Sequence, residues 1–180
     1  QVAIFKSIKS KVSVPVSVKL SPFYTNPAHV IARFDQAGAQ AVVLFNQLFQ
    51  PDINIEQEKQ TFSMSLSDSK DHRLPLRFAG LLHGSLKGTL CASSGILSGT
   101  DVIRMLLAGA DSVQVVSALY KHKITSISTM LTELEQWMDS KSYASLEDFV
   151  GTLSRKSLKD PWAYQRSQYV RALLRENPLK

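Results

Sequence analysis

The stretch that decides the fold is QAGAQAVVL, residues 36–44, in which a glycine is followed almost at once by an apolar run. Glycine readily takes the left-handed conformation in which helices end, so Gly38 predicts the end of a helix. The run Ala41–Phe45 is continuous and apolar, which is typical of a parallel strand buried on both faces. A helix that leads directly into a buried strand is the basic unit of an α/β fold.

The same pattern returns as LAGADSVQV at residues 107–115, an offset of 71 residues. Two strand-and-helix units separate the copies, which gives four such units in the chain. The expected strands are Val12–Leu20, Ala41–Phe45, Leu86–Ala92 and Ser112–Val116, and the expected helices are Pro27–Ala37, Leu74–Leu82, Asp101–Ala108 and Ile124–Met138. Helices are also expected around Val2, Ile4, Phe5 and Ile8, and in a tail over Leu146–Leu153 and Trp162–Leu174.

Regular units of this kind suit a (β/α)₈ TIM barrel, which needs eight of them and about 250 residues. We therefore expect residues 1–180 to be the C-terminal half of a single barrel domain, with the N-terminal half upstream of Gln1. An open doubly wound sheet is the alternative, and it often carries a GxGxxG turn. The glycines Gly80, Gly84 and Gly88 have neither that spacing nor a preceding strand.

The composition indicates a soluble globular chain, with 44% hydrophobic residues and no apolar run long enough to cross a membrane. The net charge of +6 is scattered, so we expect no nucleic-acid partner. The single cysteine, Cys91, cannot form an internal disulfide, which favours a reducing, cytoplasmic location. No metal is expected, because the four histidines share no metal-ligand spacing. They are His29, His72, His83 and His122.

Barrel sites lie at the carboxyl ends of the strands, and the first two strand ends carry polar groups. Lys19 lies inside an apolar strand just before a proline turn, where it can offset an anion or reach solvent from an edge strand. Asn46 ends the second strand, followed by Gln47, and its carboxamide can bind a ligand or stabilise a turn. Both interpretations stay open at each position.

The next two strand ends are rich in small residues. Ser94 and Gly95 follow the third strand, and Val116 and Ser117 follow the fourth. Backbone amides in such turns can bind a phosphate without a lysine. Paired turns after adjacent strands favour a phosphate site over plain tight turns.

These residues lie in stretches that resemble the dihydroorotate dehydrogenase family, and within it the short, soluble proteins related to the fumarate-linked class. The similarity runs nearly end to end. The matching stretches are VPVSVKLSP (14–22), LFN (44–46), QPDI (50–53), RLPLR (73–77) and LAGADSVQV (107–115).

The resemblance implies an FMN-containing (β/α)₈ barrel that oxidises dihydroorotate to orotate in pyrimidine biosynthesis. It implies that Lys19 contacts the flavin ring, and that Asn46 and the adjacent Gln47 bind the pyrimidine substrate. Ser94 and Gly95 match a Gly-Gly pair at the flavin phosphate, and Val116 and Ser117 match its second phosphate turn. We also expect a homo-oligomer.

Three positions depart from the family pattern. Ser94 replaces a glycine, Ser117 replaces a frequent threonine, and Gln47 stands where serine or threonine is common. The family's catalytic base lies on a loop before the strand of Lys19, so no catalytic base is expected in this segment. The alternatives are a non-catalytic barrel fragment or assembly module, and another barrel enzyme that binds a phosphorylated ligand.

Overall fold

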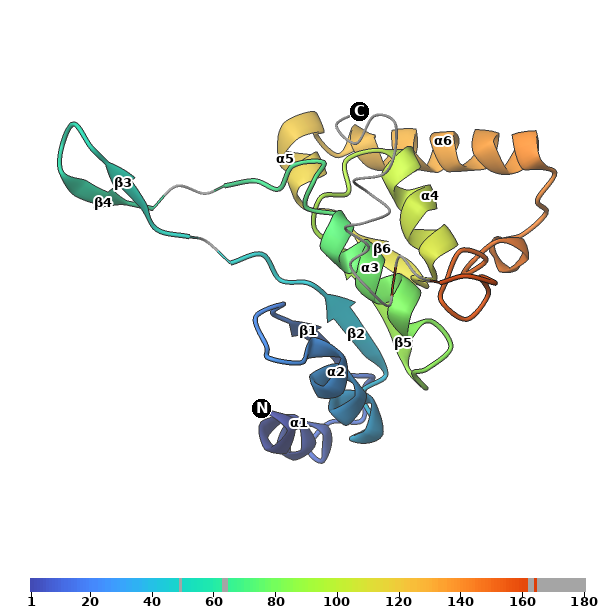
Figure 1. The fold of residues 1–180 in the computed structure, drawn as a ribbon, viewed down its shortest axis with the longest axis horizontal. Helices are drawn as coiled ribbons and strands as arrows, with labels where there is room; N and C mark the ends of the chain where they lie inside the picture. The colour runs from blue at the N-terminus through green and yellow to red at the C-terminus, as the bar shows by residue number, and fades with distance from the viewer. Residues whose placement is uncertain (49, 63–64, 162–163, 165–180) are drawn as a thin grey trace.

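Four parallel strands form the central sheet of the computed structural model, which describes residues 1–48, 50–62, 65–161 and 164. The strands are β1 (Ser17–Leu20), β2 (Ala41–Leu44), β5 (Thr89–Ser93) and β6 (Ser112–Gln114), and they lie in the order β1-β2-β5-β6. Helices alternate with the strands along the chain (Figure 1). The expected α/β fold with a parallel sheet is therefore confirmed.

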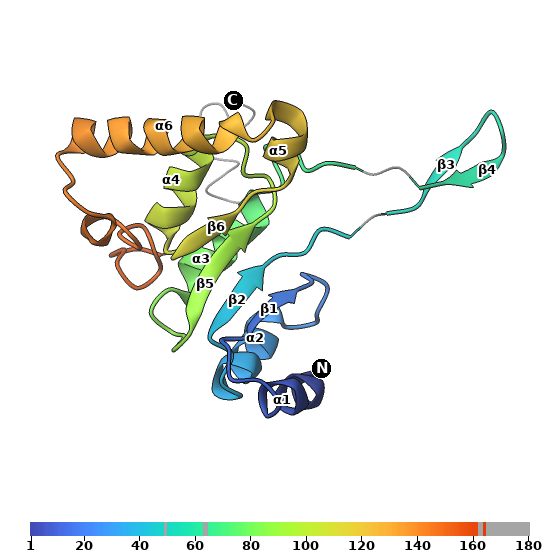
Figure 2. The ribbon, with the colours of Figure 1, turned by 180° about the vertical axis from the view of Figure 1, so that it is seen from behind.

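Helices cover one face of this sheet and leave the other face open among the described residues. The covering helices are α2 (Pro27–Gln36), α3 (Arg73–Leu82) and α4 (Gly99–Ala108), and α1 (Val2–Lys9) packs beside α2. Figure 2 shows the sheet from the side that these helices do not cover. The short α5 (Ser117–His122) leads into α6 (Thr125–Lys141), which packs on α4. None of the helices described is long and apolar enough for a bilayer crossing.

The core lies between the sheet and the covering helices. Leu44 of β2 and Ile31 of α2 are fully buried there, and Met105 of α4 closes the same cluster. Burial of each side chain of this size stabilises the fold by about 1.5–3 kcal/mol. Because side chains alternate along a strand, the register partners Lys19, Val43 and Cys91 lie on the opposite face.

The two copies of the repeat make the same contacts in the sheet. The side chain of Gln40 accepts a hydrogen bond from the Val16 N–H (3.0 Å), and Asp111 accepts one from the Leu90 N–H (2.7 Å). The N–H groups of Gln40 and Asp111 donate in return to the carbonyls of Val16 and Leu90. The repeat thus fixes the register of β2 beside β1 and of β6 beside β5.

All four expected strands are shorter in the structure, and two of them begin later than expected for reasons of hydrogen bonding. The first begins at Ser17 instead of Val12, after Pro15, which has no N–H to donate to a neighbouring strand. The third begins at Thr89 because the N–H groups of Lys87 and Gly88 donate to the Asp35 carboxylate (2.9 and 2.8 Å).

The polar stretch after β2 contains an antiparallel hairpin that the sequence did not predict. Its strands are β3 (Asp52–Asn54) and β4 (Lys59–Thr61), and the hairpin projects away from the sheet (Figure 1). Each strand is three residues long and mostly polar, so it lacks the apolar alternation by which strands are recognised.

The expected helix over Leu146–Leu153 is wrong. Only a 3₁₀ turn, η1 (Leu146–Asp148), forms before the chain turns at Gly151, where φ is +74°. The N–H groups of Gly151 and Leu153 donate to carbonyls in the last turn of α4. The Phe149 ring packs on Trp137 and Tyr143. Tertiary contacts therefore replace helical hydrogen bonds. Apart from residue 164, Trp162–Leu174 lies outside the described residues.

The two repeat glycines offer a matched test of packing at the helix ends. Gly38 and Gly109 both have positive φ (+92° and +116°), so alanine is strained at each. A Cβ at Gly109 would also lie 2.5 Å from the His83 ring, whereas at Gly38 it would meet the flexible end of Lys9 at 3.2 Å. We expect Gly38→Ala to lower the free energy of unfolding by about 1 kcal/mol and Gly109→Ala by about 3 kcal/mol. Urea unfolding of both variants measures this, and equal losses would contradict it.

Candidate functional site

One cavity of about 230 Å³ lies at the carboxyl ends of the parallel strands. All seven residues singled out from the sequence line it, namely Lys19, Asn46, Gln47, Ser94, Gly95, Val116 and Ser117. Parallel pairing brings the strand ends to one edge of the sheet, which explains why residues from distant parts of the chain meet there.

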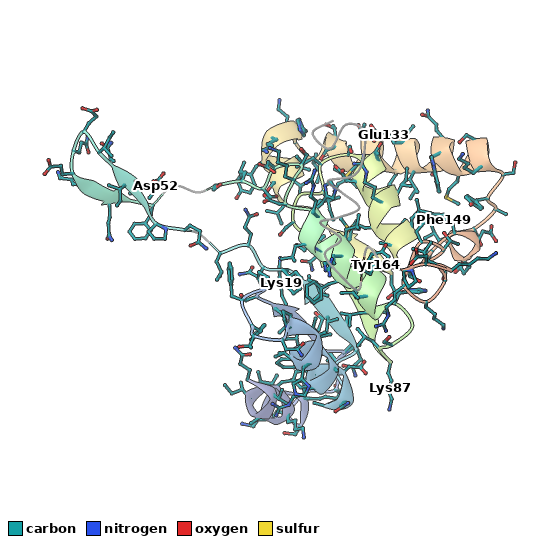
Figure 3. All side chains as sticks on the ribbon, viewed as in Figure 1. Lys19, Asp52, Lys87, Glu133, Phe149 and Tyr164 are labelled. Carbon is teal, nitrogen blue, oxygen red and sulfur yellow. The ribbon has the colours of Figure 1, made fainter. Side chains whose placement is uncertain are left out.

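Lys19 lies on the open face of the sheet, and Figure 3 labels it near the ends of β1 and β2. Its ammonium group donates a hydrogen bond to the side-chain carbonyl of Gln114 (3.3 Å). This contact joins the two outer strands, β1 and β6, across β2 and β5. Because side chains stand roughly perpendicular to a sheet, such a contact needs a sheet that is concave on this face.

Asn46 and Gln47 extend the β2 strand into the cavity wall. The Asn46 N–H donates to the Leu20 carbonyl (2.8 Å), which holds the residue beside the end of β1. Its carboxamide makes no hydrogen bond within the part of the chain that the structure describes. The Gln47 amide donates weakly to Asp71 at 3.4 Å. Asn46 therefore has both a donor and an acceptor available to a ligand.

Ser94 and Gly95 both adopt left-handed backbone conformations, with φ of +87° and +68°. Glycine takes this region of backbone conformation without strain, whereas a serine does not. Ser94, which stands where a Gly-Gly pair would have its first glycine, is therefore the more strained of the two residues. The Ser94 hydroxyl donates to the Phe45 carbonyl (3.1 Å). A side chain at Gly95 would collide with the backbone of His72, so the turn is packed against the segment before α3.

The turn that holds Ser94 is anchored by a buried carboxylate at the start of α4. Asp101 is 4% exposed and accepts hydrogen bonds from the Leu97 N–H (3.1 Å) and the Ser98 hydroxyl (3.0 Å). The Arg104 guanidinium forms an ion pair with it at 2.7 Å. A rigid turn keeps backbone donors in place before a ligand binds.

Val116 and Ser117 were expected to form a small-residue turn after the fourth strand, and in the structure Ser117 instead begins the helix α5, with Val116 as its N-cap. Val116 is exposed, whereas Ser117 is buried. The amides of the first turn of a helix have no partners within it and can bind an anion. The backbone amide of Ser117 thus lies at the start of α5 and not in a loop turn.

The sequence analysis missed Ser67, Gln114 and Tyr120, which line the same cavity. Ser67 contacts Ser117 through two hydrogen bonds and Lys121 through a third. Ser67 lies 50 residues before Ser117, in a polar stretch without periodicity, so no local pattern could have indicated this contact.

A second cavity of about 390 Å³ shares Asn46, Gln47 and Ser94 with the first. Its other lining residues include Phe23 and the cation Arg73. Asn46 therefore stands where the two cavities adjoin.

The sequence of this chain matches that of known proteins. A family model described as dihydroorotate dehydrogenase matches residues 1–138. Among the similar curated proteins is the catalytic subunit of dihydroorotate dehydrogenase B (NAD(+)) from Caldicellulosiruptor saccharolyticus, 25% identical over 154 residues, with 84% of this chain and 51% of that protein covered.

Proteins of the same name give similar values in two other organisms. The Thermoplasma volcanium protein is 29% identical, with 85% of this chain and 51% of the relative covered. The Pelobacter propionicus protein is 30% identical, with 77% and 46% covered. The chain thus spans about half the length of the curated relatives that it matches.

Cys91 allows the electrostatic environment of the open face to be tested. It is 7% exposed, as expected for a small buried residue, and burial raises the pKa of its thiol above the ordinary value. A hydrogen bond with Ser112 and the charge of Lys19 oppose this rise in pKa. Since only the thiolate reacts, we expect slow labelling at neutral pH and a rate that still rises with pH at about pH 9.

Replacement of Lys19 by methionine removes one of the two influences that lower this pKa, so the Lys19→Met variant should label more slowly still. The measurement is the labelling rate with an aromatic disulfide reagent as a function of pH. Faster labelling of the variant at neutral pH would contradict the account.

Proposed function

Because the chain belongs to the dihydroorotate dehydrogenase family, we propose that it is the flavin-binding part of an enzyme that oxidises dihydroorotate to orotate. The chemistry that FMN supplies when bound is acceptance of a hydride from the substrate. The observation that carries the proposal is the meeting of all seven expected residues around one cavity.

The proposed architecture is the C-terminal half of a (β/α)₈ barrel, with the other half contributed by residues upstream of Gln1. Four parallel strands that are concave on one face support it. The cavity volume of about 230 Å³ is below the range of about 300–1,000 Å³ usual for small-molecule sites. A site to which further chain contributes would have this property.

The residues of the cavity fit a phosphorylated flavin. Ser94 and Gly95 offer backbone amides from a turn, and Ser117 offers one from the start of α5, which suits a phosphate group. Lys19 offers a positive charge on the same wall, which would stabilise negative charge on a reduced flavin ring. Val116 is exposed beside Ser117 and would contact the flavin through its backbone and methyl groups.

In this proposal Asn46 and Gln47 bind the pyrimidine. The carboxamide of Asn46 can both donate to and accept from the polar edge of such a ring. Asn46 lies where the two cavities adjoin, so a substrate held there would be next to the flavin site.

The proton acceptor of the reaction is proposed to lie upstream. The lining of the smaller cavity, within the described residues, holds no aspartate, glutamate, histidine or cysteine. Asp71 lines the larger cavity, but its carboxylate already accepts hydrogen bonds from the Asp68 N–H (2.8 Å) and the Gln47 amide (3.4 Å). Cys91 lies below the cavity on β5, and its raised pKa disfavours the thiolate. The same observation favours, as a second candidate, a fragment that binds flavin without catalysis of its own.

The test is titration of the chain with oxidised and reduced FMN, followed by flavin fluorescence and calorimetry. Lys19→Met should weaken binding of reduced FMN about tenfold and of oxidised FMN less, because the lysine compensates the charge of the reduced ring. Lys87→Met is the control, since Lys87 is exposed just before β5, at the amino end of the strand and away from the cavity (Figure 3).

A chain that binds neither form of FMN, alone or with the upstream half of the protein, would show that the proposal is wrong. If Lys19→Met weakened the binding of oxidised and reduced FMN equally, Lys19 would not be compensating the charge of the reduced ring.

A further inference from the structure

The hydroxyl of Ser117 has both of its acceptor positions occupied by one residue. The Ser67 N–H donates to the Ser117 Oγ at 2.9 Å, and the Ser67 hydroxyl donates to the same atom at 2.7 Å. Both serines are buried, at 5% and 9% exposure. The contact is therefore shielded from water, which strengthens its hydrogen bonds.

Ser67 is held in this position by a second group on the same helix. The Lys121 ammonium donates to the Ser67 carbonyl at 2.8 Å. Ser117 and Lys121 are four residues apart on α5, so they lie on one face of the helix. The N–H, hydroxyl and carbonyl of Ser67 are thus all bonded to α5.

This arrangement determines what the Ser117 hydroxyl can still do. A serine hydroxyl has two acceptor positions and one proton to donate. With both acceptor positions filled by Ser67, only the proton remains, and no described residue accepts it. Because Ser117 lines the cavity, the cavity is where an acceptor for that proton can lie.

We propose that Ser67 is a positioning residue that makes the Ser117 hydroxyl a dedicated hydrogen-bond donor to an oxygen of a bound phosphate monoester. The inference rests on the proposed function, because the phosphate is that of the flavin. It assigns a role to the segment 65–67, which no strand-end pattern indicates. A hydrogen bond to a charged oxygen is stronger than one to a neutral group, so the site discriminates FMN from riboflavin.

The test compares FMN with riboflavin, which lacks the phosphate, in titrations of the full chain. Ser117→Ala should weaken FMN binding about tenfold, the loss expected for one hydrogen bond to a charged group. Ser67→Ala should weaken FMN binding about threefold, because the Ser117 hydroxyl loses one of the two bonds that orient it. Riboflavin binding should change in neither variant.

Two further variants separate positioning from general damage. Ser117→Thr keeps the hydroxyl and should restore FMN binding. Ser126→Ala is the matched control, since Ser126 is also buried and its hydroxyl donates to the Lys123 carbonyl (2.8 Å) outside the cavity. It should leave the ratio of FMN to riboflavin affinity unchanged.

The outcomes distinguish this inference from the proposed function. If the chain binds FMN but Ser67→Ala and Ser117→Ala leave the ratio of FMN to riboflavin affinity unchanged, the positioning role is wrong and the proposed flavin site is unaffected. An equal loss of FMN and riboflavin in both variants would equally overturn the positioning role. If neither flavin binds to the unaltered chain, both proposals fail.

Discussion

The parallel pairing of β2 with β5, from Ala41 opposite Thr89 to Leu44 opposite Ala92, holds the two halves of the chain together. It brings Asn46 beside Ser94 although the hairpin and α3 lie between them in the sequence. The bonds just beyond the strands, from the Phe45 N–H to the Ser93 carbonyl and from Ser94 back to Phe45, continue this pairing into the cavity wall. Without this register the two strand ends would not form one site.

The two faces of the sheet differ in polarity and in what covers them. The face under the helices is apolar and carries the core around Leu44. The open face carries Lys19 and Gln114, whose hydrogen bond joins the outer strands. Both side chains are exposed, so they are accessible to a ligand or to further chain. The strand register that packs the core therefore also determines which residues meet at the strand ends.

Sequence reasoning succeeded where one local pattern determined the structure. Gly38 and the apolar run after it identified β2, because helix termination and strand burial both act over a few residues. Sequence reasoning failed where contacts between residues far apart in the chain determine the local structure. Phe149 turns the chain toward Trp137 instead of continuing a helix. Ser67 meets Ser117 across 50 residues, a hydrogen bond that no periodicity encodes. The roles proposed for the cavity residues rest on the family resemblance and not on a local sequence pattern.

If the strand ends of this chain form one flavin site, a crystal structure of the chain with FMN bound will show the phosphate within hydrogen-bond distance of Ser94, Gly95 and Ser117. The flavin ring will lie against Lys19. FMN bound elsewhere, with these residues free of contact, would contradict this arrangement.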